Sequence, residues 1–491
     1  MGSIKIRLLS FFADSAARGR PAKRKMTTRL TKAAHSRTVN VSILLAILAI
    51  FASIFPLDAY SQSRSISSPA TTKPDDAIGK YTGPGSCAST TCHGSIVPRS
   101  DNRVLQNEYS IWIVKDKHSK AYAALTGPIG ERMAKILGIG AAETAPRCLT
   151  CHAVDVPQSE RGRTFELSEG VSCESCHGPA AGWLGPHTER DWTHQKSLAL
   201  GMYDTRDLTK RSEKCLSCHL GNDEKSVDHE MIAAGHPDLF FELDTFSDVM
   251  PRHWKEPGEP GEAAGTDPWY NVRELTSGQA VQLRQSLLRL ASRSHGKIWP
   301  EYSELQCYAC HHSLTPPEQS WRQARGYPGR RPGNPPWNPS RYAVFRDVVH
   351  QLDGENAEKL DSELSRLGQL MSQLNPDRDA VETSATNSAH LADELLAKMN
   401  SAPYDPEITL HLLQKISADA DDISGQGEHS AAQAAMAIQS LFLAYERNEK
   451  LQNSEQLRVA IKGLFQELQN PSAYDPARFA AQMKQVNALL R

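Results

Sequence analysis

The stretch Cys173-Glu174-Ser175-Cys176-His177 exemplifies a motif that recurs five times in this 491-residue chain. Each copy places a histidine directly after the second of two cysteines, and the copies together use all ten cysteines. The five copies are Cys87/Cys92-His93, Cys148/Cys151-His152, Cys173/Cys176-His177, Cys215/Cys218-His219 and Cys307/Cys310-His311. Two thiols followed by an imidazole are the attachment signature of c-type haem. The thiols add across the two porphyrin vinyl groups and the imidazole becomes the proximal iron ligand, so the sequence predicts five covalently bound haems.

Other uses of paired cysteines fit this pattern less well. A zinc ribbon needs two cysteine pairs for each metal and has no reason to place a histidine after every pair. Disulfides are equally indifferent to that histidine, and a redox-active pair normally occurs once. The first motif departs from the others, because Cys87 and Cys92 are separated by four residues. We still interpret it as a haem site, in which the extra residues bulge outward so that both sulfurs reach their vinyl groups.

The N-terminal segment predicts export, which haem attachment outside the cytoplasm requires. Basic residues from Lys23 to Arg37 precede an uncharged apolar run over 41–55, and Ala59-Tyr60-Ser61 follows as a small-x-small site. This is the layout of a secretory signal peptide, and the run is short for a membrane span of about 20 residues. We therefore expect residues 1–61 to be a signal peptide or, alternatively, an uncleaved N-terminal membrane anchor. The protein is expected to be periplasmic, or membrane-anchored facing the periplasm.

Composition divides the rest of the chain into four parts. Residues 62–80 are rich in Ser, Thr and Pro and predict a flexible spacer. Residues 81–313 hold every cysteine and predict a pentahaem cytochrome c domain, whereas 314–340 are rich in Pro, Gly and Arg and predict a linker. Residues 341–491 predict a bundle of six or seven helices. The expected fold class is mainly α with much irregular structure, and the formal net charge of −2 gives no sign of nucleic-acid binding.

The helices of the last part are predicted from periodicity and start signals. Leu360, Leu364, Leu367, Leu370, Met371 and Leu374 recur at helical spacing. The stretches Tyr404-Asp405-Pro406 and Tyr474-Asp475-Pro476 each place an N-capping aspartate before a proline at the first helical position.

The sixth ligand of each iron decides whether a haem can bind a substrate. An iron between two imidazoles is closed and favours electron transfer, whereas a vacant position can bind a small molecule. Eight histidines of residues 81–313 remain after the five proximal ones, and they are His118, His187, His194, His229, His236, His253, His295 and His312. For the fifth haem His295 is the nearest plausible distal ligand, because His312 adjoins the proximal His311.

The segment 87–219 resembles the family of tetrahaem cytochromes that accept electrons from hydroxylamine oxidoreductase in ammonia-oxidising bacteria. The matching stretches are Trp112 to Ala121, with the sequence WIVKDKHSKA, then Gly170 to Pro179, with the sequence GVSCESCHGP, and the motif at Cys215. The widened first motif, the fifth motif and the helical C-terminal part are departures from that family.

The resemblance implies a set of distal ligands. His187 would close the haem of His93, and His118 would close the haem of His219. The position opposite His152 would be open. A later histidine would close the third haem, and we expect His236 in preference to His229 and His253.

Two classes of function follow. The first is an exported electron carrier that passes electrons between redox partner proteins and is not itself an enzyme. The second is an oxidoreductase of small nitrogen or sulfur oxo-compounds, such as hydroxylamine, nitric oxide or nitrite, acting at a five-coordinate haem. We favour the carrier, because no other part of the sequence forms a catalytic set.

Overall fold

The structure is a computed structural model that describes residues 78–99, 104–255, 267–311 and 335–491. The expected signal or anchor over 1–61, nearly all of the spacer over 62–80 and most of the linker over 314–340 lie outside the described residues. Within the described ranges no helix is both long enough and apolar enough to cross a bilayer.

The fold is built of α-helices and short 3-10 turns, which confirms the predicted class. Extended pairing in the described ranges is limited to two isolated bridges, Tyr81 with Arg161 and Leu305 with Trp337. The helices up to residue 294 are α4 Glu108–Lys115, α5 Pro128–Leu137, α6 Pro146–His152, α7 Cys173–His177, α8 His194–Ala199, α9 Leu208–His219, α10 His229–Ala234, α11 Leu243–Val249 and α12 Tyr270–Ser294. Those that follow are α13 Ala343–Leu352, α14 Gly354–Met371, α15 Arg378–Ser401, α16 Pro406–Ala418, α17 Ala420–Gly425, α18 Glu428–Asn448, α19 Ser454–Glu467 and α20 Pro476–Leu489.

The segment that carries the first four motifs has little apolar side-chain core of its own. Its separate hydrophobic cluster comprises only Leu125, Ala134, Ala142, Leu149 and Ala153, with a few half-buried neighbours. Most of its helices are shorter than three turns. A chain with so few buried apolar side chains needs another source of burial to be stable. This composition is consistent with porphyrin rings that fill the space between the motifs.

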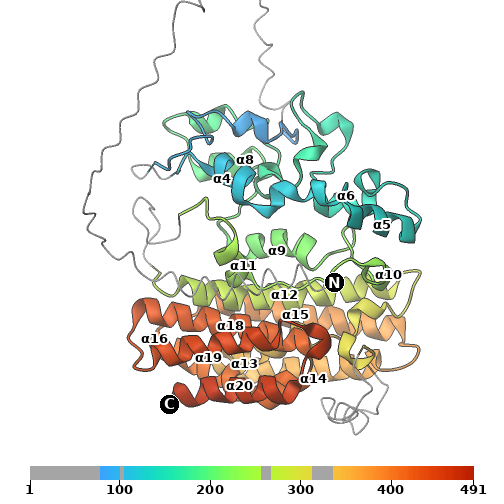
Figure 1. Ribbon diagram of the computed structural model, residues 1–491, viewed down its shortest axis with the longest axis vertical. Coiled ribbons are helices and arrows are strands. Elements are labelled where there is room, and N and C mark those ends of the chain that lie inside the picture. The colour runs from blue at the N-terminus through green and yellow to red at the C-terminus, as the bar shows by residue number, and fades with distance from the viewer. Residues whose placement is uncertain (1–77, 100–103, 256–266, 312–334) are drawn as a thin grey trace, which may run out of the picture. The chain divides into compact units, whose positions relative to one another are not determined.

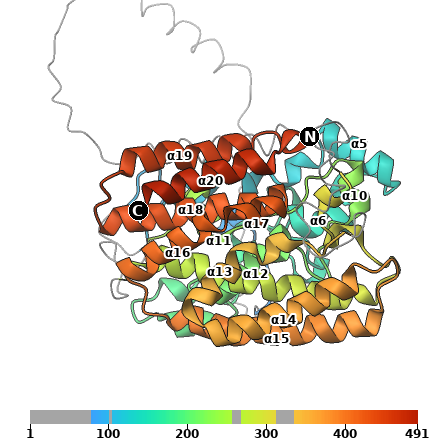
Figure 2. The same ribbon diagram turned by 90° about the horizontal axis from the view of Figure 1, so that it is seen from below.

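The C-terminal helices begin where the sequence predicts. Asp405 caps α16 by accepting a hydrogen bond from the Ile408 N–H at 2.8 Å, and Pro406 is its first residue. Asp475 caps α20 in the same way, before Pro476. Residues 341–491 contain eight α-helices rather than six or seven, and several lie side by side in Figure 2. The apolar stripe of α14 ends at Met371, because Leu374 lies beyond the helix and is almost fully exposed.

Helix α12 connects the motif-bearing segment to the C-terminal helices (Figure 1). It packs most extensively against α15 and also contacts α9, α11 and α18. Its buried apolar side chains belong to one hydrophobic core that extends from Leu208 to Leu490. Gly278 permits the close approach of α11, because a Cβ there would lie 2.7 Å from Leu243 Cβ. The core is therefore continuous across the division expected near residue 313.

Buried polar contacts link the same helices. Gln279 of α12 donates to the side chain of Gln433 of α18 at 2.9 Å, and Gln433 donates to the Phe241 carbonyl at 2.8 Å. Ser277 of α12 donates to Asn400 of α15 at 2.8 Å. Buried hydrogen bonds are costly to leave unmade, so these contacts fix the register of α12 against its neighbours.

Candidate haem sites

The second, third and fourth motifs lie on helices, which explains their spacing. α7 is the third motif itself, and the second and fourth motifs form the ends of α6 and α9. Residues three apart lie on one face of a helix, so the two thiols of each motif face the same side. The histidine that follows is held beside them by the same backbone. This is the arrangement that one porphyrin needs.

The widened first motif forms the same backbone hydrogen bond between its histidine and its first cysteine as the fifth motif does. In the fifth motif the His311 N–H donates to the Cys307 carbonyl at 2.8 Å, and in the first motif the His93 N–H donates to the Cys87 carbonyl at 3.2 Å. The additional residues form a turn closed by the Cys92 N–H on the Ser89 carbonyl at 2.9 Å. The bulge therefore brings His93 back to its first cysteine, and none of the ten cysteines is in a disulfide.

Four motif histidines each face one histidine from elsewhere in the chain. The ring centroids are 6.2 Å apart for His93 and His187, 6.2 Å for His118 and His219, 6.4 Å for His152 and His236, and 6.2 Å for His229 and His311. Two metal–imidazole bonds of about 2.0–2.1 Å each, together with the ring radii, would separate two trans imidazoles by about 6.3 Å. The residues present therefore fit a haem iron between each pair.

Hydrogen bonds engage Nδ1 in five of these rings and in the ring of His253, which leaves Nε2 as the other nitrogen. The Nδ1 atoms lie at 2.9 Å from Glu108 for His93, 2.9 Å from Asp116 for His118, 2.8 Å from the Ala121 carbonyl for His152, 3.1 Å from the Trp183 carbonyl for His187, 2.7 Å from the Pro237 carbonyl for His236, and 3.2 Å from the Pro251 carbonyl for His253. A hydrogen bond at one ring nitrogen fixes the other as the metal ligand.

Three other histidines are oriented the opposite way, with Nε2 beside a carboxylate. Nε2 of His295 lies 2.9 Å from Glu382, Nε2 of His194 lies 3.0 Å from Asp204, and Nε2 of His429 lies 3.3 Å from Asp238. The structure thus places His295 against Glu382 and not beside His311. His229 occupies the place expected for His295, although 82 residues separate it from His311 in sequence.

The second and third motifs also differ from what the resemblance implies. His236, expected at the third haem, faces His152, whose opposite side was expected to be open. His177 instead has His253 as an electrostatic neighbour. Burial lowers the pKa of His177 and of His219 to about 4, so both are neutral imidazoles at neutral pH, which is the form that binds iron.

Cysteines of different motifs lie close together. The thiol of Cys87 is within hydrogen-bonding reach of Cys173, a contact that lowers the pKa of Cys87. The thiol of Cys218 is likewise close to Cys151, and this contact contributes most to lowering the pKa of Cys218 to about 5. Burial and, next in size, the charge of Cys176 raise the pKa of Cys215. The first motif is thus adjacent to the third, the second to the fourth, and the third to the fourth.

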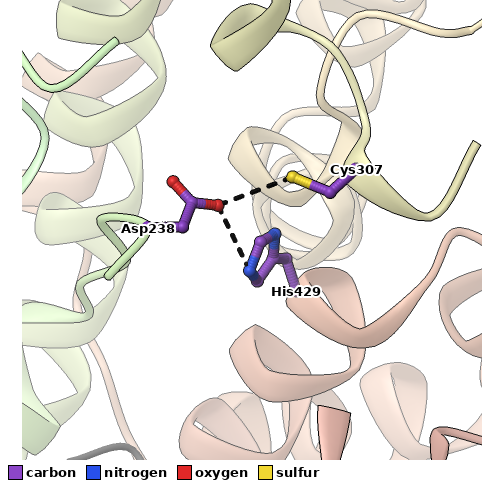
Figure 3. A group of neighbouring side chains, drawn as sticks. All are labelled: Asp238, Cys307 and His429. Atoms are coloured by element: carbon purple, nitrogen blue, oxygen red, sulfur yellow. Dashed lines mark hydrogen bonds and ion pairs between the residues drawn. The ribbon is translucent and has the colours of Figure 1, made fainter. Parts of the chain in front are cut away.

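The fifth motif is attached to the C-terminal helices. Cys307 lies 3.7 Å from Asp238, whose carboxylate also faces His429 of α18 (Figure 3). The side chain of Gln306 donates to the Gln426 carbonyl at 2.7 Å, and the ring of Tyr308 lies edge-on to Tyr474. Asp238, Cys307 and His429 could together hold a metal ion, but haem attachment would convert the Cys307 thiol into a thioether.

Comparisons with known proteins identify similarity in the first part of this region. Residues 86–178 match the family described as cytochrome c554 and c-prime. The chain is also 37% identical over 84 residues to cytochrome c-554 of Nitrosomonas europaea, an alignment that covers 15% of this chain and 34% of that protein. The chain therefore spans about a third of the length of this curated relative. No solved structure shows significant similarity to the chain. These similarities support a multihaem cytochrome with c-type haem.

Proposed function

We propose that the protein is an exported c-type cytochrome that transfers electrons through five covalently bound haems. In each motif the two cysteines would hold the porphyrin through thioether bonds, and the following histidine would bind the iron. The distal histidines would be His187 for the first motif, His236 for the second, His253 for the third, His118 for the fourth and His229 for the fifth. Bound haem supplies one-electron chemistry at its iron.

The observation that carries the proposal is the set of four facing histidine pairs. Each pair combines one motif histidine with one histidine from outside the motifs, at 6.2–6.4 Å between centroids. Packing alone gives no reason for this one-to-one matching. An iron held by two imidazoles has no vacant position for a substrate, so the arrangement favours electron transfer over chemistry at the metal.

Carboxylates adjust two of the ligands. Glu108 accepts from His93 Nδ1, and this hydrogen bond raises the pKa of His93. Burial lowers the pKa of His118, but the hydrogen bond and charge of Asp116 outweigh that effect and leave the pKa raised. A carboxylate at Nδ1 increases the electron density of a ligand imidazole. Glu108 and Asp116 would therefore favour the oxidised state at the first and fourth haems.

The competing function is reduction or oxidation of small oxo-compounds at an open iron. The resemblance implies such a position opposite His152, but His236 faces that ring at 6.4 Å. We therefore favour the carrier, with redox proteins as donor and acceptor.

Export follows from the need to attach haem outside the cytoplasm, and the apolar run over 41–55 would provide either the signal or a tether.

Two measurements on the purified mature protein test this function. Intact mass should show five haems, and electron paramagnetic resonance of the oxidised protein should show low-spin iron only. A mass with four haems would mean that the widened first motif is empty. A high-spin signal would show an open iron and would favour the oxidoreductase.

A further inference from the structure

We infer that α10 is the bridge through which electrons pass between the second and fifth haems. This inference rests on the proposed function and concerns how the fifth motif joins the other four. One short helix and its flanking residue supply a distal ligand to each of two sites. His229 is the first residue of α10, and His236 follows the helix by two residues.

The two ligands face different motifs. His229 faces His311 of the fifth motif with centroids 6.2 Å apart, whereas His236 faces His152 of the second motif with centroids 6.4 Å apart. Five of the seven steps between them lie within α10 and correspond to about 7.5 Å at the helical rise of about 1.5 Å per residue. The two irons would therefore be held close to the two ends of one helix.

A glycine turns the second ligand away from the first. Gly235 has a φ of 121°, a backbone angle that residues other than glycine rarely adopt. The chain leaves the helix at this point, and the His236 N–H bonds back to the Met231 carbonyl at 3.0 Å. His236 is thereby directed to the second motif while His229 remains directed to the fifth.

The second motif holds α10 from one side. Arg147, which precedes Cys148 on α6, binds Glu230 at 3.0 Å and also binds Asp228. Asp228 is the N-cap of α10 and accepts from the Met231 N–H at 2.9 Å. The helix that carries the second motif therefore holds the beginning of α10 through charge-assisted hydrogen bonds, which are stronger than neutral ones.

The segment before the fifth motif holds α10 from the other side. The His229 N–H donates to Glu301 at 2.9 Å, and Glu301 is buried. The ring of Tyr302 lies edge-on to His229 with centroids 5.7 Å apart. Contacts on both sides thus fix the separation of the two ligand histidines. The fifth haem would exchange electrons with the second one first.

Alanine variants of the full-length protein test the ligands. His236→Ala and His229→Ala should each retain five haems by mass and convert one low-spin haem to high-spin. His295→Ala is the matched control and should leave every haem low-spin, because its Nε2 binds Glu382. Absence of a high-spin signal in both variants, or its appearance in the control, would overturn the assignment. Wild-type protein without haem would instead refute the proposed function.

The double variant tests the bridge itself. Two neighbouring high-spin irons interact magnetically, so the spectrum of His229→Ala/His236→Ala should differ from the sum of the single variants and relax faster. A spectrum equal to that sum would refute the bridge while leaving both ligands assigned. Where alanine prevents folding, His229→Met and His236→Met replace it, since methionine ligation raises the potential of a haem. Each substitution should shift the reduction potential of the haem that it ligates and also that of the other haem. An unchanged potential of the other haem refutes the bridge.

Discussion

A chain that ends at Ser313 should lose the cooperative fold around α12, even though it retains all five motifs. In α12 six Val and Leu side chains are fully buried, and they are Val272, Leu275, Val281, Leu283, Leu287 and Leu290. Burying such a side chain contributes about 1.5–3 kcal/mol, so the six contribute about 9–18 kcal/mol. The most extensive contacts of α12 are with α15, which the truncation removes. Loss of even half of this burial is comparable with the whole stability of a typical domain, about 5–15 kcal/mol.

The assay compares three chains that differ only at this boundary. The full-length protein, the chain ending at Ser313 and the helical part beginning at Arg341 are each examined for haem mass, helical circular dichroism and thermal unfolding. We expect only the full-length chain to unfold cooperatively. A chain ending at Ser313 that keeps five haems and unfolds within a few degrees of the full-length protein would refute the reasoning. It would instead support the division expected from composition.

A matched pair of substitutions tests the same packing in the intact chain. Leu283 is fully buried in α12, whereas Leu288 of the same helix is 43% exposed. Leu283→Ala should lower the free energy of unfolding by about 2–5 kcal/mol, and Leu288→Ala by less than about 0.5 kcal/mol. Equal effects of the two substitutions would show that α12 is not part of the core.

Two further predictions concern carboxylates. The first is about two buried glutamates, and the second is about a glutamate hydrogen-bonded to a proposed iron ligand. Burial raises the pKa of Glu242 to about 7 and of Glu274 to about 8. Their contribution to stability is fully present below the unfolded-state pKa of about 4.5 and is lost as the pH rises from there through 7–8. The unfolding midpoint should fall between about pH 4.5 and 8, and a Glu274→Gln variant should show a smaller fall. Glu108→Gln weakens a charge-assisted hydrogen bond to His93 by roughly 1 kcal/mol and should raise the potential of one haem by on the order of 50 mV in a redox titration. The exposed Glu131→Gln should leave all potentials unchanged, and a shift of equal size there would contradict a local effect.

The sequence was sufficient to locate the features that depend on residues near one another. The five motifs need only a few consecutive residues, and the starts of α16 and α20 follow from Asp405-Pro406 and Asp475-Pro476. The distal ligands depend instead on contacts between distant segments. His295 is close to His311 in sequence, but a salt bridge with Glu382 fixes its Nε2, and His229 reaches His311 only because the chain returns through α10.

The domain division was difficult to predict for a related physical reason. Cysteine positions assign α12 to the haem-binding part, because it lies between the fourth and fifth motifs in the chain. Its burial on nearly all sides is instead that of a helix inside a bundle. Polar residues such as Gln279, which usually indicate a solvated face, are buried here and paired with other side chains. A hydrophobic pattern alone therefore conceals the role of this helix.

The spatial order of the motifs differs from their order in the chain, and this order would set the route of the proposed electron transfer. Close thiols place the first motif beside the third and the second beside the fourth, and Cys176 of the third motif is near enough to act electrostatically on Cys215 of the fourth. With α10 as the proposed bridge, the proposed electron path would follow motifs one, three, four, two and five. Its two ends are then the widened first motif and the fifth motif, where Cys310 is exposed. Partner proteins would exchange electrons at these ends, because the three intermediate sites have neighbours on both sides.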